Sequence, residues 1–378
     1  ISNRRTCQSM EDQLKEALKD IVTLVIPPRP EFIRLIDVGS ERFLDFFEKE
    51  ILENFVACGG ATCRFFEAGY GGGKSHLLHL INHLAVKRRM LVVSIDLTKA
   101  LSLLEWKDIT EHILCNISLH VDGKILKSLP EVLHHVTEKD RQRVRQLRLA
   151  HSGFSNAIAL YVSDYQYLDS QGREKLKRFL CGEKIGAGEL KRNNIRGVKN
   201  PLSKRNAESV LNTVLSALFS LGFNGTVILF DETDQTFSRV QHTAKVQLGA
   251  NLMRRLIDAC SNGTIRGAVA VFAVLPDFLV SCSRAYPALG DRLLMYRTTE
   301  PGWRFPILRI EDITEFAEPE MFMEKVIDKI VEQVASNKKD TLRRELLIEG
   351  RDVLYANPGT NFRRPLLKRL ASKTLQMI

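Results

Sequence analysis

The sequence predicts an α/β fold in which helices flank a parallel sheet, with a helical insertion and a C-terminal helical lid. Three observations lead to this prediction. Short apolar, β-branched segments alternate with longer amphipathic segments along the chain. One segment, 267–275, is apolar throughout, as expected of a parallel strand that is buried on both faces. The 378 residues, 44% of them hydrophobic, suffice for one large domain and a smaller appended one.

The elements follow from hydrophobic periodicity and from prolines. Residues 1–60 form a predicted N-terminal helical segment, with helices at Met10–Val22 and Ser40–Phe55 and a proline-marked bend at 27–30 between them. The core is expected over 61–310, and its five predicted strands lie at 62–66, 90–97, 226–230, 267–275 and 306–310. The predicted lid spans 311–378, and its helices lie at 319–336, 339–348 and 361–376.

A long basic insertion separates the second predicted strand from the third. Residues 105–220 are expected to be mostly helical, and within them Glu138–Arg148 is rich in arginine. The segment Gly182–Arg205 is rich in Gly, Lys, Arg and Asn. Its composition favours a mobile loop or a charged surface element.

Composition and charge argue against a membrane-spanning or disulfide-rich protein and suggest a polyanionic partner. No apolar run approaches the ~20 residues of a membrane-spanning helix, and residues 1–7 are polar, without an apolar stretch behind them. The seven cysteines stand singly, without the spacing of a disulfide framework or a zinc site. We therefore expect reduced thiols and a cytoplasmic protein. The net charge of +10 suggests a polyanionic partner.

A glycine-rich segment with the spacing of a phosphate-binding (Walker A) loop follows the first predicted strand. Residues 68–75 are AGYGGGKS, with Ala68 where the first glycine is usual. Glycines allow backbone N–H groups to turn inward around phosphates. Lys74 is expected at the β- and γ-phosphates, and a helix that begins there directs its positive dipole end at the same anion.

The Walker A segment therefore predicts binding of ATP and Mg²⁺, with the hydroxyl of Ser75 on the metal. The alternative is a structural glycine turn with an incidental Lys-Ser pair. The expected nucleotide-binding residues are Gly69, Tyr70, Gly71, Gly72, Gly73, Lys74, Ser75 and His76.

A second signal lies at 227–232, where four apolar strand residues end in Asp231 and Glu232. An acidic pair at the end of a buried strand costs free energy unless it has a function. We expect Asp231 to hold Mg²⁺ through its water shell and Glu232 to polarise the attacking water. The alternative is a strand that runs into an acidic turn, which the upstream glycine loop disfavours. Asp234 is interpreted as a cap of the next turn.

Together these residues resemble the AAA+ ATP-binding proteins of bacteriophage exclusion (BREX) systems, the C/D-type ATPases. The resemblance is most specific at 64–78 and 225–232, and further similar segments lie at 92–97, 189–211, 272–278, 286–289 and 362–363. It implies a P-loop NTPase sheet with strand order 5-1-4-3-2. It also implies a homo-oligomer that couples ATP hydrolysis to DNA binding or to partner assembly with other defence-system proteins.

The resemblance implies further site residues in the lid and at the N-terminal segment. Arg363 resembles a sensor-2 arginine, with Arg364 as the alternative, although an arginine on the face of a basic helix is the simpler explanation. Val38 and Gly39 resemble the segment that lines the adenine pocket.

The resemblance also bears on turnover, at three positions near the fourth and fifth strands. Arg292 is the first choice for an arginine finger supplied across a subunit boundary, and Arg297 the second. Such a residue contributes ~10³–10⁵ in rate; the alternative is an ordinary surface arginine. Leu275 stands where a polar sensor-1 residue is usual, which favours slow turnover.

Two clusters of basic residues predict contacts with DNA phosphates that do not depend on sequence. The alternative is a solvated face or a surface for an acidic protein. The clusters are Arg141, Arg143, Arg145 and Arg148, and Lys184, Lys191, Arg192, Arg196, Lys199, Lys204 and Arg205. Two rival functions remain open: a non-hydrolysing, ATP-responsive scaffold or regulatory subunit, and a small-molecule kinase.

Overall fold

The computed structural model describes residues 10–24, 33–98, 100–137, 143, 149–233, 243–294, 302–316, 318–357 and 362–378. The chain divides into two compact units. Unit 1 comprises Ile1–Phe46, Phe66–His83 and Leu308–Ile378, and unit 2 comprises Phe47–Phe65 and Leu84–Ile307. The proline bend, Arg141, Arg145, Arg148, Asp234 and Arg297 lie outside the described residues.

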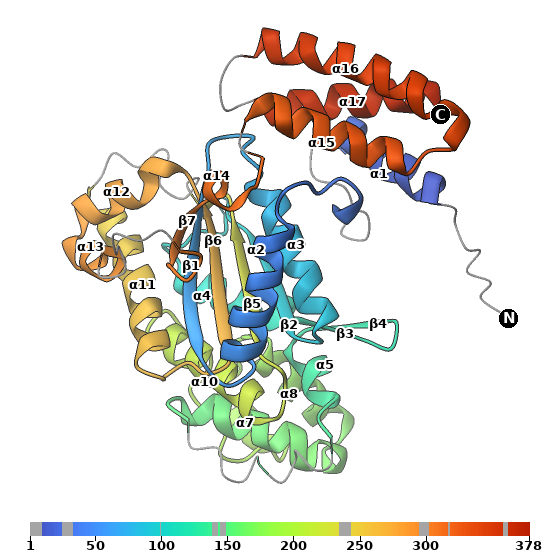
Figure 1. The fold of residues 1–378 in the computed structure, drawn as a ribbon. Helices are drawn as coiled ribbons and strands as arrows, with labels where there is room; N and C mark the ends of the chain where they lie inside the picture. Colours follow the sequence, from blue (N-terminus) through green and yellow to red (C-terminus); the bar gives the residue numbers. More distant parts are fainter. Residues whose placement is uncertain are drawn as a thin grey trace, which may run out of the picture. The chain divides into compact units, whose positions relative to one another are not determined.

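A seven-stranded sheet has the order β4-β3-β2-β5-β6-β1-β7 (Figure 1). The strands are β1 (Ala61–Glu67), β2 (Leu91–Asp96), β3 (Ser118–Val121), β4 (Lys124–Lys127), β5 (Thr226–Asp231), β6 (Ala268–Val274) and β7 (Ile307–Arg309). Parallel pairing joins β2 to β5 and β5 to β6. When only the five predicted strands are numbered, their order is 2-3-4-1-5, which is 5-1-4-3-2 from the other edge.

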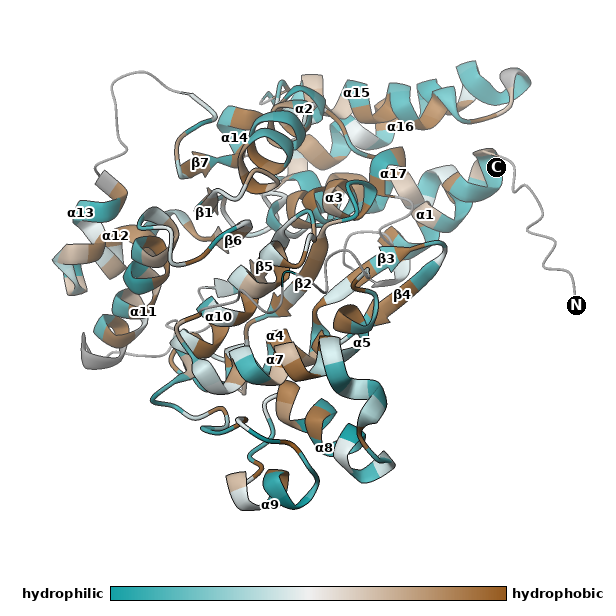
Figure 2. Ribbon diagram, turned by 90° about the horizontal axis from the view of Figure 1, so that it is seen from below, coloured by the Kyte–Doolittle hydropathy of each residue, from teal (hydrophilic) through white to brown (hydrophobic). Residues whose placement is uncertain are grey.

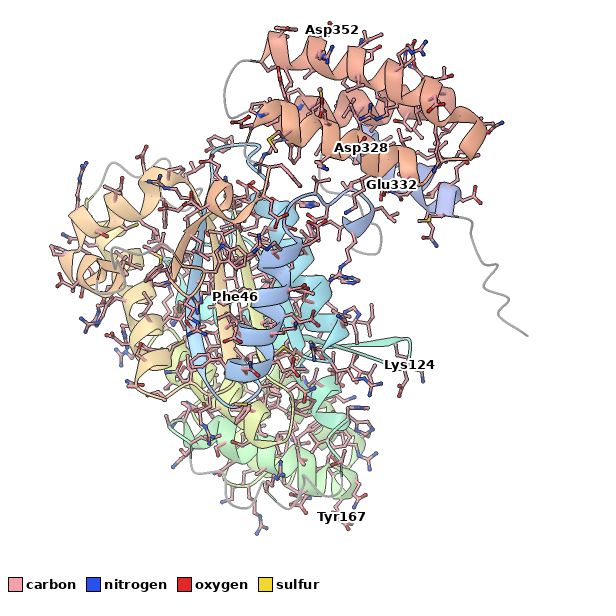
Figure 3. All side chains as sticks on the ribbon, in the orientation of Figure 1. Phe46, Lys124, Tyr167, Asp328, Glu332 and Asp352 are labelled. Atoms are coloured by element: carbon pink, nitrogen blue, oxygen red, sulfur yellow. The ribbon has the colours of Figure 1, made fainter. Side chains whose placement is uncertain are left out.

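The expectation of a purely parallel sheet is wrong because a hairpin extends the β2 edge. Strand β3 pairs antiparallel with β2, and β4 pairs antiparallel with β3. Asp122 (φ 50°) and Gly123 (φ 74°) make the turn, and positive φ at both central residues suits a two-residue hairpin. Lys124, at the start of β4, lies on this hairpin (Figure 3).

Buried strand residues form the centre of unit 2. All seven residues of β6 are buried, which explains its uninterrupted apolar sequence. The ring of Phe272 stacks on Phe230 of β5, with centroids 4.4 Å apart, and on Phe65 of β1 at 5.0 Å. Figure 2 shows β2 and β5 mostly in brown, the hydrophobic end of the scale. An aromatic pair of this kind contributes about 0.5–1.5 kcal/mol beyond burial, so the stack stabilises the order of three adjacent strands.

Helices complete unit 2. The π-helix η2 (Phe47–Val56) carries the buried Glu48, which accepts hydrogen bonds from Lys87 and Arg88 at the end of α3 (Lys74–Lys87). The six cysteines in the described part of the chain are free thiols. The remaining elements are α4 (Trp106–Asn116), α5 (Leu129–His134), α7 (Ser152–Asp164), η4 (Tyr165–Tyr167), α8 (Ser170–Leu180), α9 (Ala187–Arg192), α10 (Ala207–Ser220), α11 (Thr243–Ser261), α12 (Pro276–Ala285) and α13 (Pro287–Leu294).

Unit 1 joins both ends of the chain in one hydrophobic cluster. The N-terminal helix α1 packs on the C-terminal helix α17, and Leu14 and Leu18 share the cluster with Leu366 and Leu370. A Cβ on Gly350 would lie 2.5 Å from Met323 Sδ, so α16 packs closely on α15. The helices are α1 (Met10–Leu24), η1 (Ile33–Leu35), α2 (Glu41–Phe46), α14 (Ile310–Ile313), α15 (Pro319–Glu332), η6 (Ser336–Lys338), α16 (Lys339–Ala356) and α17 (Arg363–Met377).

Candidate nucleotide site

The glycine loop of unit 1 connects β1 to α3 and closes tightly on itself. Gly71 (φ 73°) and Gly73 (φ 94°) have left-handed backbone conformations that side chains disfavour. A Cβ on Gly72 would lie 2.8 Å from Ala68 Cβ and 3.1 Å from the Gly69 carbonyl oxygen. The N–H of Gly72 donates to that oxygen at 3.1 Å. The loop is therefore a backbone cradle that a side chain would fill, which fits the binding of a phosphate chain.

The lysine of the loop is held by the loop itself. Lys74 is the first residue of α3, and its Nζ donates to the carbonyl oxygens of Ala68 at 2.9 Å and Gly69 at 3.1 Å. The ammonium also lies 5.5 Å from the ring centroid of Tyr70, a residue that is 63% exposed. The loop thus carries a fixed cation beside its own backbone, and Ser75 and His76 follow in the first turn of α3.

An arginine from the lid contacts the same loop. Arg363 begins α17 and is 8% exposed, and its Nη1 donates to the Gly72 carbonyl oxygen at 3.3 Å while Nη2 donates to Thr314 Oγ1 at 3.3 Å. Burial lowers the pKa of Arg363. Among the described residues, no carboxylate lies within ion-pair distance of this guanidinium. The guanidinium also lies over the Phe322 ring, 5.0 Å from its centroid. A buried cation whose hydrogen-bond partners are neutral oxygens favours the approach of an anion.

The segment around Val38 and Gly39 is tied to the helix that follows the loop. Asp37 is buried and accepts a hydrogen bond from Ser40 Oγ at 2.6 Å, and its Oδ1 lies 3.1 Å from His76 Nε2. Burial alone would raise the pKa of Asp37, but the hydrogen bond and charge of His76, with Ser40 and Lys329, lower it.

Further contacts join this segment to the lid. The N–H of Glu315 donates to the Gly39 carbonyl oxygen at 2.9 Å, and Lys329 of α15 donates to the carbonyl oxygen of Asp37. A Cβ on Gly39 would lie 2.9 Å from the Phe316 ring, so only glycine fits there. Unit 1 therefore brings together three predicted parts: the 38–39 segment, the loop and Arg363.

The acidic pair lies at the end of β5 in unit 2. Glu232 has φ 53°, a left-handed conformation that costs a non-glycine residue about 1–3 kcal/mol. Its N–H donates to Asp231 Oδ1 at 2.8 Å, which stabilises the turn. In the parallel register Asp96 of β2 is opposite Asp231, so two carboxylates end neighbouring strands. Thr233 is fully buried, and its hydroxyl has no hydrogen-bond partner within the described ranges.

Sequence reasoning missed several residues of these regions. Asp37 carried no local signal, because its partner His76 is far away in sequence. The signal for Asp96 was its place at the end of the second predicted strand, where a carboxylate meets the end of a neighbouring parallel strand.

Comparison with known proteins decides the family. A family model described as "BREX system ATP-binding protein BrxC/D" matches residues 25–129 and 107–359, most of the chain. The chain belongs to this BrxC/D family. No curated protein and no solved structure matches it. Membership supports an ATP-binding role in a phage defence system. Within the described ranges, no helix has the length and apolar character of a membrane span.

Two residues of this BrxC/D-family chain were predicted to bear on ATP turnover, and the structure gives the contacts and position of each. Leu275 precedes α12 as its N-cap, directly after the buried Val274. Arg292 in α13 donates from Nε to Asp258 Oδ1 at 2.7 Å, and Asp258 also pairs with Arg254 at 3.1 Å. An arginine finger at position 292 would have to exchange this ion pair for its target.

The basic segment Gly182–Arg205 of the BrxC/D-family chain is packed, so the expectation of a mobile loop is wrong. It contains α9, and Leu190, Ile195 and Val198 are buried in the core of unit 2. Its basic side chains are exposed, which fits the other interpretation, a charged surface element. Of the Arg-rich segment 138–148, only Arg143 is among the described residues.

Proposed function

We propose that the chain is an ATPase that binds ATP and Mg²⁺ with its glycine loop and hydrolyses ATP. The observation that carries the proposal is the contact between Arg363 and the Gly72 carbonyl oxygen. This contact puts a buried cation at a glycine cradle that already holds the Lys74 ammonium. The Lys74 ammonium and the buried Arg363 guanidinium at one glycine loop suit the negative charge of a polyphosphate.

Each residue has a role in this proposal. The loop N–H groups and Lys74 bind the β- and γ-phosphates, and Arg363 neutralises charge that develops on the γ-phosphate. Ser75 and Asp231 would hold Mg²⁺, which when bound neutralises phosphate charge. Glu232 orients the attacking water and accepts its proton, because it is the carboxylate next to the metal ligand. Val38 and Gly39 would contact the adenine.

We further propose that ATP state controls assembly with partner proteins or DNA in a homo-oligomer, with Arg292 as the finger supplied in trans. The support is the link between lid and loop. Because Arg363 begins α17 and contacts Gly72, the charge of a bound nucleotide would act directly on the lid. A ligand shifts a conformational equilibrium by its differential affinity for the two states, and this contact provides such a difference.

A second candidate function is a scaffold that binds ATP without hydrolysis. Two observations favour this scaffold. Leu275, directly after β6, has no polar group that could orient the γ-phosphate or water, and Arg292 is already paired with Asp258.

ATP binding and turnover in wild type, Lys74→Ala and Glu232→Gln separate the two functions. An ATPase loses binding in Lys74→Ala, whereas Glu232→Gln keeps binding and loses at least ~100-fold in turnover. Glu320→Gln, an exposed residue of α15, is the matched control and should behave as wild type. Wild type that binds ATP but turns over no faster than Glu232→Gln, in the presence of DNA and at high protein concentration, would establish the scaffold instead.

A further inference from the structure

Residues 191–205 of unit 2, hereafter the cationic platform, carry a dense positive charge. The segment holds six basic residues and no carboxylate: Lys191, Arg192, Arg196, Lys199, Lys204 and Arg205. All six are exposed. Lys204 pairs with Glu105 at 2.7 Å. For Lys191, Arg192, Arg196 and Lys199, no carboxylate lies within ion-pair distance in the described part of the chain.

Apolar anchors hold the cationic platform in place. Ile195, Val198 and Leu202 are 1%, 3% and 2% exposed and belong to the core of unit 2. Left-handed residues alternate with these anchors, with φ 57° at Asn194 and 55° at Asn200. These turns let the backbone direct each apolar side chain inward while the neighbouring basic side chain points to solvent.

Contacts from α7 and from Asn206, the N-cap of α10, fix the backbone of the cationic platform. Asn156 Nδ2 donates to the Gly197 carbonyl oxygen at 2.8 Å. A Cβ on Gly153 would lie 1.8 Å from the Lys199 carbonyl oxygen, so the two backbones touch. Asn206 Nδ2 donates to the Pro201 carbonyl oxygen at 3.0 Å and closes the far end. The backbone that carries the basic side chains is therefore fixed, which lowers the entropy cost of binding a charged partner.

The chemistry of the surface favours nucleic acid over protein. Protein interfaces are centred on apolar or aromatic anchors, whereas interfaces with a phosphate backbone are polar and strongly positive. Every large apolar side chain of the cationic platform is buried, so none is left to anchor a protein partner. Two tyrosines of η4 precede the platform in sequence: Tyr167 is exposed and lies outside residues 191–205, and Arg173 and Lys177 lie over the Tyr165 ring, 5.6 and 5.8 Å from its centroid. Stacking on this ring is therefore not the basis of binding.

We propose that the cationic platform is a preformed surface that binds the phosphate backbone of duplex nucleic acid without sequence preference. The inference rests on the part of the proposed function that couples the protein to DNA, and it names the residues responsible. Because every anchor and clamp belongs to unit 2 and none to the glycine loop, the surface of a single copy binds nucleic acid with or without ATP, and the proposed control by ATP acts on the assembly of copies.

Fluorescence anisotropy of the full chain with labelled 30-base-pair duplexes tests the proposal. Binding of two unrelated sequences is measured between 50 and 200 mM salt, with and without ATP. We expect equal affinity for both sequences, and a charge-reversed triple variant, Lys191→Glu with Arg192→Glu and Arg196→Glu, should bind at least ~30-fold more weakly. Its slope of log affinity against log salt should fall by about 2.7, at ~0.9 per phosphate contact.

Two variants control for bulk charge and for folding. Arg344→Glu with Arg351→Glu and Lys368→Glu makes the same change in net charge on exposed residues of unit 1, and should lose less than ~3-fold. Asn156→Ala removes a clamp and no charge, and should weaken duplex binding several-fold while the salt slope stays unchanged. The triple variant of the platform should keep basal ATP turnover, which would show that it folds. Its loss of duplex binding would then be independent of ATP hydrolysis.

Three outcomes would overturn the inference. One is wild-type affinity in the platform triple. Another is an equal loss in the triple of unit 1, which would make bulk charge responsible. The third is polyglutamate that displaces duplex at equal charge concentration, which would assign the surface to an acidic protein. If the protein does not turn over ATP but still binds duplex through the platform, only the hydrolysis proposal is contradicted.

Discussion

The glycine loop and the cationic platform both present positive charge, but in opposite environments. Around the loop, Arg363 is buried and its N–H groups are held by Gly72 and Thr314. On the platform, the cations are exposed and only the backbone beneath them is fixed. A buried cation interacts strongly at short range with one anion of the right shape, and water and salt screen it little. Exposed cations give weaker, additive and salt-sensitive attraction. We therefore expect one region to select a single ligand and the other to bind the phosphate backbone of duplexes of any sequence.

The largest effect should come from filling the loop cradle. Gly72→Ala would place a Cβ 2.8 Å from Ala68 Cβ and 3.1 Å from the Gly69 carbonyl oxygen, so the backbone of the loop must shift. We expect at least a ~100-fold loss of ATP affinity, measured by calorimetry, with an unchanged circular dichroism spectrum. Gly188→Ala in α9 is the matched control, because nothing lies within 4 Å of its Cβ position. Equal ATP affinity in both variants would show that the loop does not enclose phosphate.

Replacing the lid arginine is expected to have the next largest effect. Arg363→Lys keeps the charge but loses the forked contact to Gly72 and Thr314, and we expect a ~10–100-fold fall in ATP turnover. Because the site is buried, the ratio of variant to wild type should be the same at 50 and 200 mM salt. A ratio that approaches one at high salt would mean that Arg363 acts like a platform cation.

Stability against pH tests the segment that joins the loop helix to the lid. The pKa of Asp37 is lowered from 3.8, so its ionised form stabilises the fold. This contribution is present above pH 3.8 and is lost as the pH falls through the lowered pKa. Asp37→Asn should lower the free energy of unfolding by about 1–3 kcal/mol at pH 7. This difference from wild type should become smaller as the pH falls below 3.8. Urea denaturation at pH 7 and pH 3 measures it, and a constant deficit would contradict the assignment.

The smallest predicted effect is a difference in duplex affinity between variants of two lysines of the platform. Lys204 already pairs with Glu105, whereas Lys199 has no such partner among the described residues. Lys204→Ala should therefore reduce duplex affinity less than ~2-fold, and Lys199→Ala several-fold. Equal losses in the anisotropy assay would show that the existing ion pair does not decide which cations meet phosphate.

Much of the fold was predictable because hydrophobic runs report burial directly. The uninterrupted apolar stretch 267–275 became β6, the prediction at 90–97 became β2, and Lys74 begins α3 as expected. The hairpin 118–127 was missed because its strands have four residues each and one of them, β4, is largely exposed. Short strands at a sheet edge leave no periodicity to detect.

Features that depend on distant parts of the chain were beyond the sequence. The glycine spacing predicted the loop, but nothing local shows that Asp37 meets His76 or that α1 packs on α17. Of the two interpretations of segment 182–205, the mobile loop, which followed from its Gly and Asn content, was wrong. The informative signal was the spacing of Ile195, Val198 and Leu202, which recur every three or four residues and anchor it.

The packing of α1 on α17 has a consequence for synthesis on the ribosome. Translation proceeds from the N-terminus, so every residue of unit 2 is made before the last helix emerges. Leu14 and Leu18 must wait for Leu366 and Leu370, and the loop receives Arg363 only after all of unit 2 has been made. The platform is thus complete on the nascent chain before the helix that brings Arg363 to the nucleotide loop has been made.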